Sequence, residues 1–114
     1  MAKASARLLD WRPVQRNTLL GFARVQFGSG LIVSEIAIHV AGSRAWAQPP
    51  ARAWIEDNKL ILTETGRPRW QPIIDFANHG VRASWSRQVL AALREARPEV
   101  LPENLESSSP DLLR

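Results

Sequence analysis

The side chains that most often perform catalytic chemistry are few and widely spaced in this 114-residue sequence. It holds two histidines, His39 and His79, and no cysteine. Glu35 and His39 fall on one side of a predicted strand, but four residues of extended chain separate them by about 13 Å, which is too far for an acid and base pair. Asp75 near His79 is the best remaining pair, and we interpret it as a helix cap or an ordinary hydrogen bond. We therefore assign no catalytic residue and expect no enzyme.

Metal and cofactor sites are not predicted either. Zinc bound by cysteine is excluded, and two histidines with scattered carboxylates are too few for another metal site. The glycines of Gly28-Ser29-Gly30 precede a predicted strand, so the helix N-terminus that binds phosphate in glycine-rich loops is missing. We expect no metal, no cofactor and no small-molecule substrate.

Arginine and tryptophan indicate a different chemistry, the binding of a polyanion. Arg44-Ala45-Trp46 recurs eight residues later as Arg52-Ala53-Trp54, on either side of a proline pair. Arginines neutralise phosphates, and indole rings stack on bases. Alternatively, each tryptophan covers one end of the sheet while its arginine lies in solvent. The candidate nucleic-acid contacts are Arg24, Arg44, Trp46, Arg52, Trp54, Arg67, Arg69, Arg82 and Arg87.

The charge distribution fits a polyanionic partner without requiring one. The net charge is +4 at pH 7, and residues 1–100 contain 14 basic and 8 acidic side chains. The last 14 residues reverse the sign, with one arginine against Glu103, Glu106 and Asp111. A basic body with an acidic tail is compatible with nucleic-acid binding. Genomic codon bias toward arginine would produce the same excess, so charge alone does not decide.

The elements that must position these residues begin with a predicted β-hairpin over residues 19–40. With Gly28-Ser29 as a two-residue turn, Phe27 pairs with Gly30 and Val25 with Ile32. This register predicts a buried face and a mixed outer face. The buried face consists of Leu19, Val25, Phe27, Ile32, Ile36 and Ile38, and the outer face of Leu20, Phe22, Arg24, Gln26, Glu35, Ala37 and His39.

Further strands and one helix are predicted after the hairpin. Residues 44–48 form a short strand that ends at Pro49-Pro50, and residues 60–76 form a second hairpin that continues the same sheet. The apolar period then changes to that of a helix on which Trp85, Val89 and Leu93 share one stripe. Asn78 or Ser84 caps its start and Pro98 stops it. Trp85 is therefore expected in the core.

Together these elements predict an α+β fold, with an antiparallel sheet of four to five strands packed against one C-terminal helix. We expect residues 1–17 to be a basic flexible arm, residues 18–97 a single domain and residues 98–114 an acidic disordered tail. No apolar run is long enough for a membrane helix and the N-terminus has no secretory segment, so we expect a soluble, cytoplasmic protein with no membrane partner.

The order of short motifs resembles that of a known family. The run Ser34-Glu35-Ile36-Ala37-Ile38, then Gly42, then Trp46-Ala47-Gln48-Pro49-Pro50, is similar to the stage V sporulation protein G family, the septation regulators. The resemblance covers roughly residues 19–96. It implies a small β-sheet protein with one main helix, a dimer, that binds nucleic acid as a regulator and is not an enzyme.

Two functional hypotheses follow. The first is a regulatory protein, involved for example in transcription, that binds DNA or RNA through a basic, tryptophan-containing sheet surface, as a homodimer. The second is a protein-interaction or structural module that uses exposed sheet edges and binds no nucleic acid, since Leu20, Phe22 and Ala37 leave an apolar patch on the outer hairpin face. Titration with an oligonucleotide separates the two.

Overall fold

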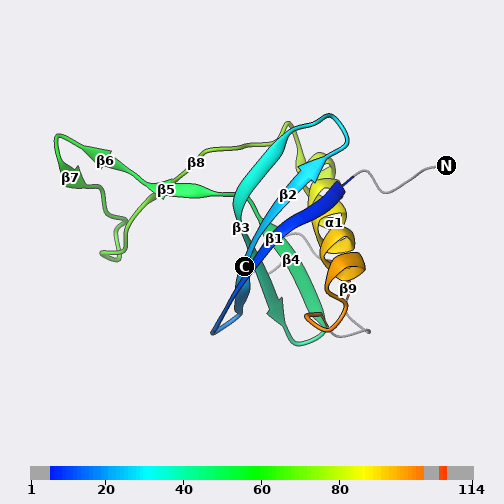
Figure 1. Ribbon diagram of the computed structural model, residues 1–114. Coiled ribbons are helices and arrows are strands. Elements are labelled where there is room, and N and C mark those ends of the chain that lie inside the picture. The colour runs from blue at the N-terminus through cyan, green and yellow to red at the C-terminus, as the bar shows by residue number, and fades with distance from the viewer. Residues whose placement is uncertain (1–5, 102–105, 108–114) are drawn as a thin grey trace.

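The structure, a computed structural model, describes residues 6–101 and 106–107 and consists of one main sheet, one helix and a projecting arm (Figure 1). Helix α1 (His79–Ala96) covers one face of the main sheet. The strand order is β1-β2-β3-β4-β9, antiparallel from β1 to β4 and parallel between β4 and β9. These strands are β1 (Ala6–Arg16), β2 (Leu19–Phe27), β3 (Ile32–Ala41), β4 (Arg44–Gln48) and β9 (Glu106–Ser107). The predicted α+β fold, with an antiparallel sheet packed against one C-terminal helix, is confirmed.

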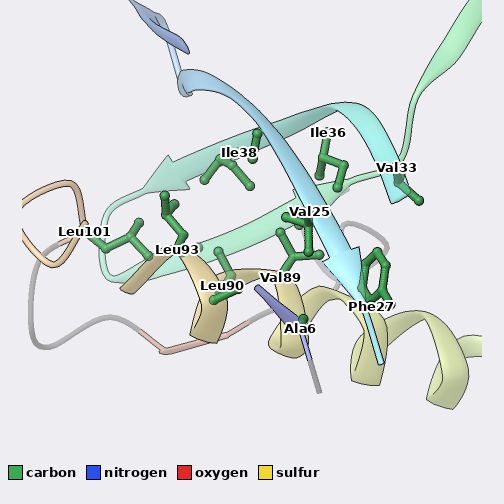
Figure 2. Packing of buried hydrophobic residues seen from close by; sticks show 14 residues of the cluster. Ala6, Val25, Phe27, Val33, Ile36, Ile38, Val89, Leu90, Leu93 and Leu101 are labelled. Carbon is green, nitrogen blue, oxygen red and sulfur yellow. The ribbon is translucent and has the colours of Figure 1, made fainter. Parts of the chain in front are cut away.

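The core lies between the helix and this sheet, as Figure 2 shows. Ile36, Ile38, Val89 and Leu93 are fully buried, and burial of side chains of this size contributes about 1.5–3 kcal/mol each. The prediction that the helix covers the apolar face of the hairpin is confirmed. Trp85 also packs against this core, with its ring centroid 6.0 Å from that of Phe27.

The helix begins and ends close to where its pattern predicts. Of the two candidate caps, Asn78 is the one used: its Oδ1 accepts a hydrogen bond from the Val81 amide at 2.9 Å. The last helical turn closes with the Arg97 amide donating to the Leu93 carbonyl, and Pro98 follows. Strand β4 likewise has the predicted bounds.

The predicted register of the first hairpin is wrong. The turn has three residues, because Gly30 adopts a φ of 97° and the Phe27 amide bonds the Leu31 carbonyl at 2.8 Å. Val25 therefore pairs with Val33, which is buried, whereas Ile32 is 44% exposed. A bulge at residues 34–35 then shifts the phase, so that the next apolar residues of β3 again face the core.

The expectation of a flexible N-terminal arm is wrong for residues 6–16. They form β1, the edge strand of the main sheet, where Pro13 is tolerated because an edge strand has a side with no ladder partner. Pro13 pairs with Gly21, where a Cβ would collide with the backbone of Arg12 and with Pro13. The absence of a side chain at residue 21 lets β1 lie close to β2 at this pair. Residues 1–5 lie outside the described part.

The expectation of a disordered tail from residue 98 is also wrong where the structure describes it. Leu101 is 2% exposed, and Val100 packs against the core cluster. Glu106–Ser107 then pairs with the start of β4. The remaining tail residues, 102–105 and 108–114, lie outside the described residues.

The predicted second hairpin does not continue the main sheet. Residues 51–72 instead form an arm of two small sheets, which projects away from the side of the main sheet that α1 covers (Figure 1). Pro49 and Pro50 separate the arm from β4, since proline cannot donate to a ladder. In the arm β5 (Ala51–Ala53) pairs with β8 (Trp70–Pro72), and β6 (Ile55–Glu56) pairs with β7 (Lys59–Leu60).

Candidate nucleic-acid interface

Three chain segments of the arm, which contain Trp54, Ile61 and Arg69, are joined by a ring of backbone hydrogen bonds. The Trp54 amide donates to the Arg69 carbonyl, the Arg69 amide to the Ile61 carbonyl, and the Ile61 amide to the Trp54 carbonyl, at 2.8 to 2.9 Å. At the tip, Asp57 and Asn58 both adopt positive φ, as a two-residue type I′ hairpin turn requires. The arm is therefore an ordered β structure with little core of its own.

One face of the arm is cationic and aromatic. Arg52 pairs with Gln71, and the next pair that points to the same side is Trp54 with Arg69. The Arg69 guanidinium carbon lies 5.9 Å from the centroid of a Trp54 ring. We call these four residues, Arg52, Trp54, Arg69 and Gln71, the cationic face. Three of the nine predicted contacts thus come together on neighbouring strands.

Within the cationic face, Trp54 is held in place from two sides. Its Nε1 donates a hydrogen bond to Glu56 Oε2 at 3.2 Å, and the Arg69 guanidinium lies beside its ring. Arg52 and Arg69 are both exposed, so their guanidinium groups are accessible to an anion. An arginine beside an ordered indole ring combines a phosphate contact with a stacking surface.

The opposite face of the arm is apolar. Cross-strand pairing and alternation place Ala53, Ile55, Leu60, Leu62 and Trp70 on it, and we call these five residues the apolar face. Ile55 is 60% exposed, Leu60 46%, Leu62 50% and Trp70 62%. Large apolar side chains that lie together in solvent are uncommon on an isolated soluble domain, so this face is a candidate interaction surface.

The other predicted contacts lie away from the cationic face. Arg67 is exposed on the arm, and its amide donates a hydrogen bond to Thr63 Oγ1 in the turn that precedes Arg69. Arg44 is exposed at the start of β4, and Arg87 is exposed on α1. Arg24 is exposed on β2, in a shallow recess that Asp10, Arg12 and Glu35 also line. The structure therefore divides the predicted set among the arm, the helix and the sheet.

Trp46 has little surface to offer a base. It is 8% exposed and stacks on His39, with ring centroids 5.2 Å apart and an angle of 8° between the planes. The His39 ring also shares a hydrogen bond of 2.9 Å with Thr18 Oγ1. Half-burial of the imidazole lowers the pKa of His39 below its ordinary value. Of the two tryptophans predicted to stack on bases, Trp54 is the accessible one.

Arg82 lies at the start of α1, in a recess lined by Asp75, Phe76, Asn78 and His79. Its guanidinium carbon is 5.8 Å from the Phe76 ring centroid, and its Nε is buried without a hydrogen-bond partner. Asp75 and His79 thus border the same recess, but the Asp75 Oδ1 accepts a hydrogen bond from the Phe76 amide at 2.9 Å. This geometry gives no reason to assign acid-base chemistry to the pair.

The described residues contain neither a metal-ligand cluster nor a membrane-spanning helix. No group of three or more histidine, aspartate or glutamate side chains in residues 6–101 and 106–107 is arranged to hold a metal ion. Over the same residues, α1 is not apolar enough to span a membrane.

Trp70 is the residue of this interface that sequence reasoning missed. The sequence pattern places residues 60–76 in the main sheet, where Trp70 would be partly covered. The available signal was a third arginine and tryptophan combination, Arg69-Trp70, which is flanked by Pro68 and Pro72. Prolines on both sides disfavour a central strand and favour an exposed ribbon.

Comparison with known proteins leaves the chain without an identified family. No family model matches it, and no curated protein or solved structure matches it either. The resemblance to the stage V sporulation protein G family therefore stays a prediction.

Proposed function

We propose that this protein is a non-enzymatic regulator, for example of transcription, that binds DNA or RNA through the cationic face of its arm and acts as a homodimer in the cytoplasm. The observation that carries the proposal is the convergence of Arg52, Trp54 and Arg69 on one face of an exposed ribbon. A two-stranded ribbon is narrow enough for a DNA major groove, and an accessible indole is suited to stacking on an unpaired base. Both forms of nucleic acid belong in the test.

The experiment is a titration of a labelled single strand and a labelled duplex at two salt concentrations. We expect affinity to fall steeply with salt, because each neutralised phosphate releases counterions. The double substitution Arg52→Ala and Arg69→Ala should weaken binding and reduce the salt slope by about 1.4 for a single strand or about 1.8 for a duplex. Binding that is absent at low salt, or a slope that the double variant leaves unchanged, would contradict the proposal.

Arg97→Ala is the matched control for this titration. Arg97 lies at the far end of α1 and pairs with Glu99, with Nε 2.8 Å from Oε2. The Arg97→Ala substitution lowers the net charge by one and changes no residue of the arm. We expect a smaller effect on affinity than that of either arm arginine alone, because a general charge effect is screened over a Debye length of about 10 Å at 0.1 M salt.

We assign the homodimer contact to the apolar face. A ribbon two strands wide has no second layer, so its exposed apolar side chains lose water only against another molecule. A second copy presents the same surface, which suits a two-fold contact between identical patches. Light scattering on a sizing column should give a dimer mass, and Ile55→Lys should convert it to a monomer. Leu31→Lys is the control, because Leu31 is equally exposed, at 58%, but lies in the turn between β2 and β3.

The apolar face also supports a second candidate function, a protein-interaction module that binds no nucleic acid. The exposed fractions of Ile55, Leu62 and Trp70 favour it independently of any charge. Light scattering and the titration together decide between the two. An arm-dependent dimer that ignores both oligonucleotides at low salt supports the interaction module and rejects the nucleic-acid proposal.

A further inference from the structure

The edge of the main sheet at β4 is covered by the chain's own C-terminal segment. Strand β9 pairs in parallel with β4, with Glu106 opposite Arg44 and Ser107 opposite Ala45. Between α1 and this strand, Val100 and Leu101 pack against the core, which anchors the returning chain. The short strand therefore lies at the end of β4 that carries an exposed arginine.

The two outward amides of β4 are satisfied in different ways. The Ala47 amide donates to Oγ of Ser86, a buried side chain of α1, at 2.9 Å. Alternate amides of an antiparallel strand point to the same side, so the Ala45 amide points to this edge too, where β9 lies. The Ala47 amide is thus satisfied by a buried side chain of the helix. The Ala45 amide instead depends on a parallel pairing of only two residues, which is weak and which another strand can replace.

The charge of the covering segment is opposite to that of the body. Three acidic residues, Glu103, Glu106 and Asp111, lie in the last 14 positions, and Glu106 is in register with Arg44. Arg44 is an exposed phosphate contact predicted from the sequence, and it lies outside the cationic face as a second contact beside those of the arm. An acidic strand at this edge therefore competes with a polyanion for the same arginine.

We propose that the β4 edge is a binding site for an extended acidic segment, and that the chain's own segment around Glu106 and Ser107 fills it and competes with nucleic acid. The strand site stands on the sheet geometry alone, and the competition rests on the proposed function. The regulated step is the release of this segment, which removes the acidic strand from beside Arg44 and leaves the Ala45 amide free.

Hydrogen exchange tests the strand site without any nucleic acid. In the full chain we expect the amides of Ala45 and Ala47 to be protected. In a chain that ends after Leu101, which keeps the buried Val100 and Leu101, the Ala45 amide should exchange at least about tenfold faster, because its strand partner is gone. The Ala47 amide is the internal control, since its bond to Ser86 stays and its exchange should not change. Equal exchange of Ala45 in both chains overturns the strand site.

Oligonucleotide titration tests the competition. At low salt we expect the shortened chain to bind roughly threefold to tenfold more tightly than the full chain, with a smaller difference at high salt because charge competition is screened. The full-length variant with Glu103→Gln, Glu106→Gln and Asp111→Asn should bind as the shortened chain does. A peptide of residues 102–114, added to the shortened chain, should weaken binding again and restore protection of the Ala45 amide.

Hydrogen exchange and oligonucleotide titration can contradict the strand site and the competition independently of each other. Protection of Ala45 that depends on the segment, together with equal oligonucleotide affinity in all variants, rejects competition and leaves nucleic-acid binding standing. Protection that depends on the segment, with no binding by any variant at low salt, rejects the proposed function and the competition while the strand site holds.

Discussion

The body and the arm are both built from antiparallel strands, but they differ in what covers them. In the body, α1 covers one face of the main sheet, and Val25, Ile36 and Ile38 are fully buried. In the arm no second layer is present, and Ile55 and Trp70 are 60% and 62% exposed. The stability of the fold therefore resides in the body, and the surface available to partners is concentrated in the arm.

This contrast predicts that equal truncations have unequal effects. Leu93→Ala in the core should lower the free energy of unfolding by about 2–5 kcal/mol, because it leaves a cavity where no solvent enters. Leu62→Ala removes the same atoms from a side chain that is half exposed, so stability should change by no more than about 0.5 kcal/mol. Urea unfolding of the two variants measures both values. Equal losses would show that the arm is part of the stabilising core.

The polar part of the core gives the next largest effect. Ser86 is 1% exposed, and its hydroxyl oxygen accepts a hydrogen bond from the Ala47 amide of β4. Ser86→Ala leaves that amide buried without a partner, so we expect a loss of about 1–3 kcal/mol in unfolding free energy. Ser84→Ala, on the same helix, removes only a 3.5 Å contact from Gln88 and should be close to neutral. A neutral Ser86→Ala would mean that another group satisfies this amide.

The smallest effect is a pH dependence of the body. Burial lowers the pKa of His39 in the folded protein below 6.5, so in acid the unfolded chain binds a proton more readily than the folded one. The His39 contribution to stability is therefore intact above pH 6.5 and decreases as the pH falls from there to the folded pKa. Thermal unfolding of the wild-type protein and of the His39→Gln variant, each at pH 7.5 and at pH 5.5, measures this contribution of His39. The variant should lose less stability on acidification than the wild type, and equal losses would contradict the account.

The strongly periodic parts of the fold were predictable from the sequence. The helical stripe and Pro98 located α1, and the proline pair located the end of β4. The hairpin register was not predictable because Ile32 and Val33 are both apolar, so alternation does not fix which one faces the core. The phase is decided by Gly30 at positive φ and by the bulge at residues 34–35, which the residue types do not reveal.

The arm shows a second limit of sequence reasoning. Arg52 and Trp54 were predicted contacts because the Arg44-Ala45-Trp46 motif recurs at residues 52–54. The assignment of residues 60–76, which include Arg69, to the main sheet was wrong because an exposed ribbon and a half-buried strand have the same alternation. Only the structure shows that Trp70 is 62% exposed and therefore belongs to the apolar face of the arm.

The most direct test of the central claim, that the arm carries nucleic-acid binding while the body carries the fold, is removal of the arm. The Ile73 amide donates to the Pro50 carbonyl at 3.2 Å, so a two-residue Asn-Gly turn can replace residues 51–72 between these neighbours. The shortened protein should unfold cooperatively with the α-helical circular dichroism of the parent, and titration should show its oligonucleotide affinity lost at low salt. A folded armless protein that binds with the parent's affinity would contradict the account.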